Sequence, residues 1–245
     1  MRPLSPAEVL SLWELGSALP PLERALLLLR AALPDQAPGE LARLPLGRRD
    51  RLLVELRAAT FGAELPFFAR CPACAGEVEF TMGANQLLAG GPPERGVPEP
   101  RELRAGEAWV LFRLPDSRDL AAAGAAPPER AEEAIFERCV LEARVAGVSV
   151  QAGELSATVR EALASAIAEA DPDAEVTVAL SCPACGRGWS GLFDILSVLW
   201  SEVAGQARRL LQEVDALARA YGWREADVLA LPPKRRALYL EMVTA

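Results

Sequence analysis

The sequence predicts a helix-rich α+β protein with N-terminal helices, two zinc-knuckle β-hairpins clasped by one four-cysteine zinc site, and a long C-terminal helix with a helical hairpin tail. Apolar residues recur at helical spacing through most of the chain. The tetrapeptide Cys-Pro-Ala-Cys occurs twice beside segments with strand-like alternation, and a heptad pattern occupies residues 193–221. We divide the chain into an N-terminal helical segment (1–62), a zinc-clasped α/β domain with inserted helices (63–192) and a C-terminal part with the long helix and hairpin (193–245).

The composition excludes several classes of protein. The chain has no histidine, which excludes Ser-His-Asp and Cys-His nucleophiles and any imidazole-ligated metal. A formal net charge of −8 argues against a general nucleic-acid binder, which needs a basic face. The longest apolar run, residues 25–29, is far shorter than the roughly 20 residues of a membrane span. With no apolar stretch typical of a signal peptide, we expect a cytoplasmic protein with reduced cysteines.

Three helices are predicted in the N-terminal segment. Ser5-Pro6-Ala7-Glu8 offers an N-cap serine, a proline at the first helical position and a glutamate at the third, which is the pattern of a capping box. Residues 22–33 are apolar on most sides and predict a buried helix. Residues 47–60 place Leu52, Leu53 and Leu56 on one face, and Phe61-Gly62 ends that helix.

Strands and shorter helices follow in the centre of the chain. Residues 65–70 and 78–82 predict two strands joined by a cysteine-bearing turn. Residues 89–107 are rich in glycine and proline and predict a surface loop. The remaining elements predicted here are a strand at 109–114, helices at 116–123, 128–145 and 154–170, and a strand at 174–180 that leads into the second cysteine turn.

Four of the five cysteines form two identical pairs, Cys71 with Cys74 and Cys182 with Cys185. Two such turns supply the four tetrahedral ligands of one structural Zn²⁺. The long separation of the pairs predicts a zinc ribbon with a large insertion, because compact ribbons separate theirs by about 15–20 residues. A thioredoxin-type redox pair and two disulfides are the alternatives. Cys139 lies on the apolar face of a predicted helix and is expected to be a core thiol.

The long helix carries an unbroken apolar seam. Such a seam packs along another helix, which belongs either to the same domain or to a partner chain. The seam consists of Phe193, Leu196, Trp200, Val203, Ala207, Leu210, Val214, Leu217 and Tyr221, and all of these except Ala207 are candidate partner-binding residues. After Gly222 we predict a short helix at 224–231, a Pro232-Pro233 break and a last helix to about residue 243.

No catalytic motif is present, since the sequence contains no P-loop, dinucleotide-binding or nucleophile-elbow signature. Charged residues are dense at Arg113, Asp116, Arg118 and Asp119, directly after a predicted strand. This patch is either a site or a surface ion-pair cluster with a helix cap, and the second interpretation is favoured. We therefore expect a protein that is not an enzyme.

An ordered set of segments resembles a known family. The set comprises GRRDRLLVELRAATFG, the first CPAC hairpin, FRLPDSRDL, EADPDAEVTVALSCPACGRGW with FDILSVLWSEV, and YGWREADVLALPPKRRALYLEMV. Over about residues 45–245 it is similar to zinc-knuckle proteins of contractile phage tails and tail-like injection systems, related to T-even phage baseplate-hub and hub-assembly proteins. The resemblance implies a baseplate component, or a chaperone that assembles the hub around the spike, with the four cysteines as metal ligands.

Three classes of function follow from these observations. The first is an assembly protein that binds other tail proteins (hub, spike or tube), in the bacterial cytosol or in a particle assembled there. The second is a zinc-ribbon nucleic-acid or transcription accessory protein, which the net charge of −8 disfavours. The third is a thiol redox protein, which requires cysteines that react readily with oxidants.

Overall fold

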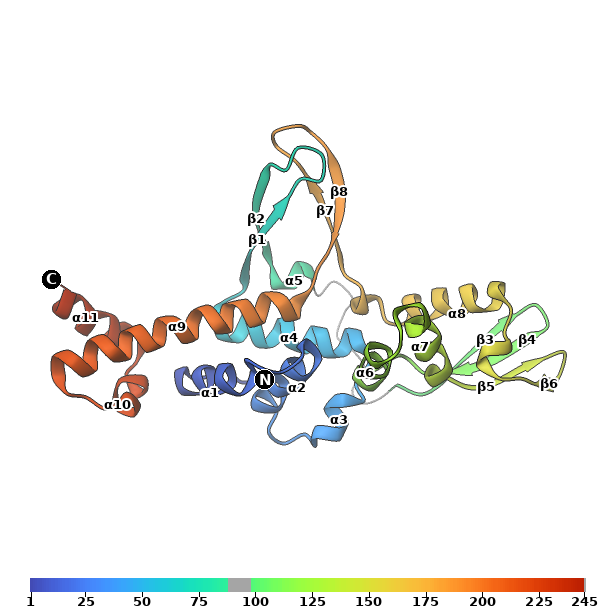
Figure 1. Ribbon diagram of the computed structural model, residues 1–245, viewed down its shortest axis with the longest axis horizontal. Coiled ribbons are helices and arrows are strands. Elements are labelled where there is room, and N and C mark those ends of the chain that lie inside the picture. Colours follow the sequence, from blue (N-terminus) through green and yellow to red (C-terminus); the bar gives the residue numbers. More distant parts are fainter. Residues whose placement is uncertain (88–97, 245) are drawn as a thin grey trace.

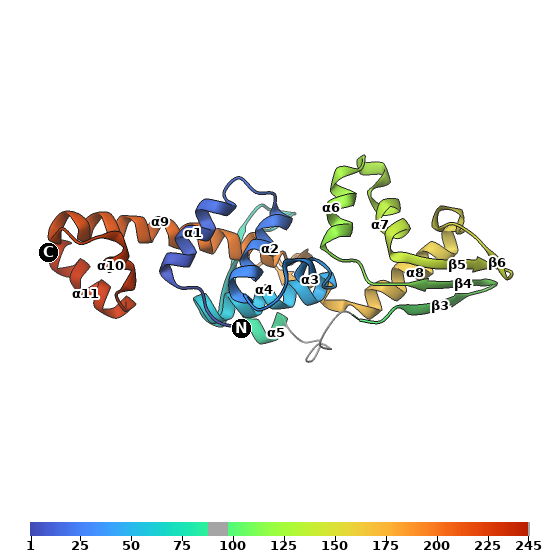
Figure 2. The same cartoon turned by 90° about the horizontal axis from the view of Figure 1, so that it is seen from below.

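The structure is a computed structural model that describes residues 1–87 and 98–244, and it confirms a helix-rich α+β fold with small antiparallel sheets (Figure 1). A helical body occupies the middle of the molecule, and two β-hairpins project from it side by side. A four-stranded sheet with its helices lies at one end, and the C-terminal helices lie at the other (Figures 1 and 2).

The helical body is built from α1 (Pro6–Gly16), α2 (Pro21–Ala32), α3 (Pro38–Ala42) and α4 (Leu46–Phe61), together with α9 (Ile195–Tyr221). The predicted capping box is present, with Ser5 and Glu8 each satisfying a backbone N–H of the other. Helix α3 was not predicted, because its five residues are too few to show a helical period. One continuous apolar core joins these helices, with Leu28, Leu53, Leu199 and Leu210 fully buried in it.

The two hairpins are separate two-stranded antiparallel sheets. The first hairpin pairs β1 (Glu64–Arg70) with β2 (Glu77–Gly83), and the short helix α5 (Ala84–Leu87) follows it. The second hairpin pairs β7 (Thr177–Ser181) with β8 (Gly188–Leu192) and leads directly into α9. In the middle of the first hairpin Phe67 stacks on Phe80 at 5.1 Å and meets Phe193 edge-on at 5.4 Å, and side chains of both hairpins pack against the main core.

The third sheet has four strands in the order β3 (Arg101–Ala105), β4 (Ala108–Phe112), β5 (Val140–Val145) and β6 (Val148–Ser149). Each strand pairs antiparallel with the next one in this order. One face packs on α7 (Ala131–Cys139) and α8 (Ala157–Ala170) and forms a second apolar core. Helix α6 (Ser117–Ala125) connects this region to the body.

Two predictions for this region were wrong. The predicted helix at 128–145 ends at Cys139, after the 3-10 turn η1 (Pro128–Arg130) and α7, and residues 140–145 form β5. Strand β4 lies beside this segment and pairs with it, and this long-range pairing overrides the helical spacing. The predicted loop at 89–107 contains strand β3, which pairs with β4 and buries Leu103 and Ala105 against the second core. The part of that loop at 88–97 lies outside the described residues.

The C-terminal helices fold back along α9. Gly222 ends α9 in the left-handed conformation, at φ 69°, as predicted. Helices α10 (Glu225–Ala230) and α11 (Pro233–Thr244) then pack against α9, and the buried Arg236 donates to Glu213 of α9 at 2.6 Å. Arg236 belongs to the basic run Lys234-Arg235-Arg236, so at least one residue of this run faces α9 and not solvent. Tyr221, Trp223 and Tyr239 form an aromatic cluster at this junction.

Candidate metal centre

The tips of the two hairpins bring the four paired cysteines together. The sulfur atoms of Cys71, Cys74, Cys182 and Cys185 all lie within 4.8 Å of one another. Cys71 Sγ is 3.7 Å from Cys185 Sγ, and Cys74 Sγ is 3.6 Å from Cys182 Sγ. Both of these contacts join one hairpin to the other.

These distances fit a metal ion better than disulfides. All five cysteines are free thiols, and sulfurs 3.6 Å apart are well beyond the roughly 2.05 Å of an S–S bond. Four thiolates around Zn²⁺ at about 2.3 Å lie about 3.8 Å from one another when the coordination is tetrahedral. The cluster therefore has the ligand set and the spacing of a closed four-thiolate site.

The two cysteine turns, residues 71–76 and 182–187, have the same backbone hydrogen bonds. In the first, Cys71 N–H donates to Gly76 O and Ala75 N–H donates to Cys71 O, both at 2.9 Å. In the second, Cys182 N–H donates to Arg187 O and Gly186 N–H donates to Cys182 O, again at 2.9 Å. Such a turn aims both sulfurs of a pair at one point, as the repeated tetrapeptide predicts.

The fifth residue of each turn is left-handed, at φ 56° for Ala75 and φ 72° for Gly186. Glycine adopts this conformation freely, whereas alanine is strained by its Cβ. The two turns thus differ in sequence at this position. The structure shows that the backbone keeps its geometry there nonetheless, at the cost of a strained alanine.

Gly76 lies against the sulfurs for a different reason. A Cβ on this residue would be 3.2 Å from Cys74 Sγ and 3.8 Å from Cys182 Sγ. The cluster leaves little room for any side chain at this position. The contact with Cys182 could not be predicted from the sequence, because it depends on how the two hairpins face each other.

The thiols of the cluster differ in acidity. Burial opposes ionisation of Cys71, but the backbone N–H groups of Cys74 and Ala73 donate to its sulfur, and the pKa of Cys71 falls to about 7. The N–H of Arg187 favours the thiolate of Cys185, but the sulfurs of Cys74 and Cys71 outweigh it, and the pKa of Cys185 rises to about 12. Four adjacent thiolates thus need a cation to balance their charge near neutral pH.

Helix α4 and the turn η3 (Pro172–Ala174) hold the second hairpin in place from below. The backbone N–H of Gly47, at the start of α4, donates to Asp171 Oδ2 at 2.9 Å, and Arg51 donates to Asp173 at 3.0 Å. A Cβ on Gly47 would overlap Asp171 Oδ1 and would lie 2.7 Å from the backbone nitrogen of Ala174. Because α4 precedes the first hairpin and η3 precedes the second, this contact sets the spacing of the two hairpins.

The chain itself covers much of the predicted seam. Val203, Leu210 and Leu217 are fully buried within the chain, so these three are not available to a partner. Phe193, Leu196, Trp200 and Val214 are partly buried and pack against the main core. Tyr221 is 39% exposed and belongs to the aromatic cluster with Trp223 and Tyr239. The seam thus packs on its own domain, which is one of the two interpretations that the sequence allowed.

Trp200 illustrates how the seam is used. Its ring is so close to Gly16 that a Cβ there would lie 2.8 Å from Trp200 Cζ3. The guanidinium of Arg24 also lies over the Trp200 ring, 4.6 Å from the ring centroid. Arg24 in turn donates a hydrogen bond to the backbone oxygen of Gly16 at 2.9 Å. Trp200 of α9 therefore packs against both α1, through Gly16, and α2, through Arg24.

The charged patch after β4 is a buried cap and ion-pair cluster. Asp116 caps α6 and forms a capping box with Asp119, and both carboxylates are buried. Arg113 donates to both oxygens of Asp119, at 2.6 and 2.8 Å, and Arg138 donates to it at 2.8 Å. Burial raises the pKa of Asp119, but Arg113, the N–H of Asp116 and Arg138 together lower it to about 2. Arg118 pairs with Asp116, so the whole patch is engaged in holding α6.

Cys139 is buried beside this patch, with Sγ 3.9 Å from Asp119 Oδ2. Burial and the negative charge of Asp119 raise the pKa of Cys139 to about 12. This thiol is therefore a core residue, as predicted, and it lies apart from the four-cysteine cluster.

A family model described as T4 bacteriophage base plate protein matches residues 28–200, a range that includes both cysteine turns. Neither the curated proteins nor the solved structures contain a match. No helix in residues 1–87 or 98–244 combines the length and the apolarity needed to cross a membrane. Because the family match covers most of the sequence, the chain belongs to the T4 bacteriophage base plate protein family.

Proposed function

We propose that this chain is a non-enzymatic component of the baseplate of a contractile phage tail or tail-like injection system, assembled in the cytoplasm, and that it acts by binding other tail proteins. The family match over residues 28–200 carries this proposal. It covers α4, all three sheets and the start of α9, which are the parts that build both hairpins and the four-cysteine cluster.

The second part of the proposal is one structural Zn²⁺ on Cys71, Cys74, Cys182 and Cys185. Four thiolates leave no open coordination position, so such an ion stabilises the fold and performs no chemistry. The ion would join two turns that are more than a hundred residues apart in the sequence, which greatly restricts the unfolded chain. The sulfur distances and the shared turn geometry support this assignment.

A non-enzymatic role is supported by what the buried charges do. Arg57 is bound to Glu202 and to two backbone carbonyls, and Arg236 is bound to Glu213. Within the described residues, no buried side-chain nitrogen or oxygen lacks a hydrogen-bond partner. Buried polar groups in an active site are often arranged for a substrate instead, whereas here they connect helices and strands.

The alternative role for a member of this family is a chaperone, which would help to assemble the baseplate hub and would be absent from the finished particle. The two roles differ in where the protein is found. A component is expected in purified particles at a fixed ratio to the tail proteins. A chaperone is expected in the soluble extract, bound to hub or spike protein, and absent from the particles.

Quantitative mass spectrometry of particles and extract from the native gene cluster tests the proposal. Recovery of the chain in the particles, with baseplate, hub, spike or tube proteins, supports a baseplate component, whereas recovery in the extract alone, bound to hub or spike protein, supports a chaperone. Recovery with nucleic acid and without tail proteins would instead support the zinc-ribbon nucleic-acid interpretation. Reversible disulfide formation among the four cysteines under mild oxidants, in protein that contains no metal as purified, would support the redox interpretation.

A further inference from the structure

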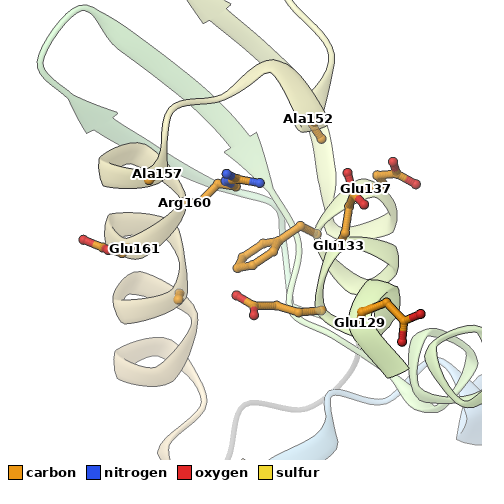
Figure 3. Close-up of a pocket in the computed structure, with 11 residues that line it drawn as sticks. Glu129, Glu133, Glu137, Ala152, Ala157, Arg160 and Glu161 are labelled. Atoms are coloured by element: carbon orange, nitrogen blue, oxygen red, sulfur yellow. The ribbon is translucent and has the colours of Figure 1, made fainter. Parts of the chain in front are cut away.

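A groove between α7 and α8 lies apart from the four-cysteine cluster. Both helices pack on the same face of the four-stranded sheet, where Phe136, Val159 and Leu163 enter one core. A cavity of about 420 Å³ opens to solvent between them. Figure 3 shows Glu129, Glu133 and Glu137 on the α7 side and Arg160 projecting from α8 toward them.

The groove is strongly acidic. Five carboxylates and one guanidinium line it, and they belong to Glu129, Glu132, Glu133, Glu137, Glu161 and Arg160. Its remaining lining is apolar or small and consists of Phe136, Ala152, Gly153, Ala157 and Ala164. The groove therefore has an apolar floor that methylene groups can cover, with most of its carboxylates on the α7 side and Glu161 directed away from α7 (Figure 3).

Few cations of this chain balance those carboxylates. Arg138 of α7 is directed to Asp119 at 2.8 Å and not to the groove. Arg130 reaches Glu133 at 3.0 Å and Glu137 at 3.9 Å, and its side chain is 59% exposed, so these pairs contribute little free energy and can be exchanged. In residues 1–87 and 98–244, no ion pair involves Glu129, Glu132 or Glu161.

We infer that this groove binds a basic segment of another tail protein, and that an arginine or lysine of that segment lies on the apolar floor among the carboxylates. Such side chains combine an aliphatic stem, which suits Phe136 and the alanines, with a cationic end that pairs with carboxylates. Charge complementarity selects a basic partner over an acidic peptide or a nucleic acid. The inference rests on the proposed function, because it presumes that the partner is a tail protein.

A photo-cross-linking amino acid in place of Ala157, a groove residue of α8, tests the inference in cells that express the chain with its tail proteins. The same amino acid in place of the exposed neighbour Thr158, which does not line the groove, is the matched control. We expect an adduct from position 157 with another tail protein, within a few residues of an arginine or lysine, and at least five-fold less adduct from position 158.

Neutralising variants test the charge requirement. The triple variant Glu132→Gln, Glu133→Gln, Glu137→Gln is expected to lower the yield of that adduct at least five-fold. A control with the same change in net charge replaces exposed glutamates outside the groove, Glu14→Gln, Glu79→Gln and Glu169→Gln, and is expected to keep the yield. Circular dichroism and bound metal serve to show that both variants fold.

Several results would overturn the inference while leaving the proposed function intact. They are adducts on a neutral or acidic segment, on a second copy of this chain or on nucleic acid, equal yields from the two triple variants, or no adduct although the chain is found with tail proteins. If the chain is never found with tail proteins, the proposed function itself is wrong.

Discussion

The backbone N–H of Gly47 donates to the carboxylate of Asp171 at 2.9 Å, across 124 positions of the sequence. Asp171 thereby occupies the start of α4, where backbone N–H groups have no partner within the helix. This contact fixes η3 beneath the second hairpin, while α4 continues into the first. The four cysteines therefore meet at the hairpin tips because the hairpin bases are held together from below.

Replacing Gly47 by alanine is expected to destabilise the protein by about 2–3 kcal/mol, because overpacking a close contact of this kind costs about that much. The new Cβ would displace Asp171 and the backbone of Ala174. Urea unfolding measures the change. Gly39→Ala is the control, since a Cβ there meets nothing within 4 Å, and this variant is expected to be neutral or slightly more stable. Equal free energies of unfolding for both variants would contradict the proposed role of the contact.

The left-handed residues of the two cysteine turns predict opposite effects of exchanging alanine and glycine. Gly186→Ala is expected to destabilise the folded, metal-binding turn by about 1–2 kcal/mol. A Cβ at Gly186 meets no neighbour, so this cost comes only from placing alanine in a left-handed backbone conformation. Ala75→Gly is expected to leave the stability of the folded turn unchanged or to raise it by up to about 1 kcal/mol. Glycine removes the backbone strain of the left-handed alanine, but it also gives the unfolded chain more conformational freedom, which offsets part of the gain. Competition with a zinc chelator compares the variants, and a weaker metal affinity of Ala75→Gly would show that the turn at Ala75 is not strained.

Asp119 gives a pH dependence with a defined sign. Its pKa in the folded protein is about 2, below the ordinary value of 3.8, so its ion pairs stabilise the protein above about pH 4 and are lost as the pH falls toward 2. Asp119→Asn is expected to cost about 3 kcal/mol at pH 7, because Arg113 and Arg138 lose their shared partner. The difference in free energy of unfolding between wild type and variant should shrink between pH 4 and pH 2, and the four cysteines, common to both proteins, cancel in it. A difference that is constant with pH would contradict the ion-pair account.

Cys139 is expected to resist alkylation under conditions that modify the exposed Cys74. Its pKa of about 12 leaves almost no thiolate at pH 8, and it is also buried in the ion-pair cluster at α6. After removal of metal by a chelator, iodoacetamide should modify Cys74, which is exposed, well before Cys139. Peptide mass spectrometry resolves the sites. Modification of Cys139 at the rate of Cys74 would show that the ion-pair cluster around Asp119 does not shield this thiol.

Much of the site could be predicted from the sequence because it is local. Each cysteine pair, its proline and its flanking strands lie within a few positions, and the turn geometry follows from them. The features that could not be predicted depend on distant segments. Strand β5 exists because β4 lies beside it, and Gly76 is close to Cys182 because the second hairpin faces the first. Trp200 belongs to an apolar seam in the sequence, but only the fold shows that Gly16 and Arg24 cover it.

The metal content of the purified chain tests the central claim, one zinc ion held by both hairpins, most directly. Native mass spectrometry of protein prepared without chelators is expected to show one zinc per chain, retained in Cys139→Ser and lost in Cys182→Ser. Protein that contains no zinc, or a Cys182→Ser variant that binds zinc as tightly as Cys139→Ser, would contradict the claim.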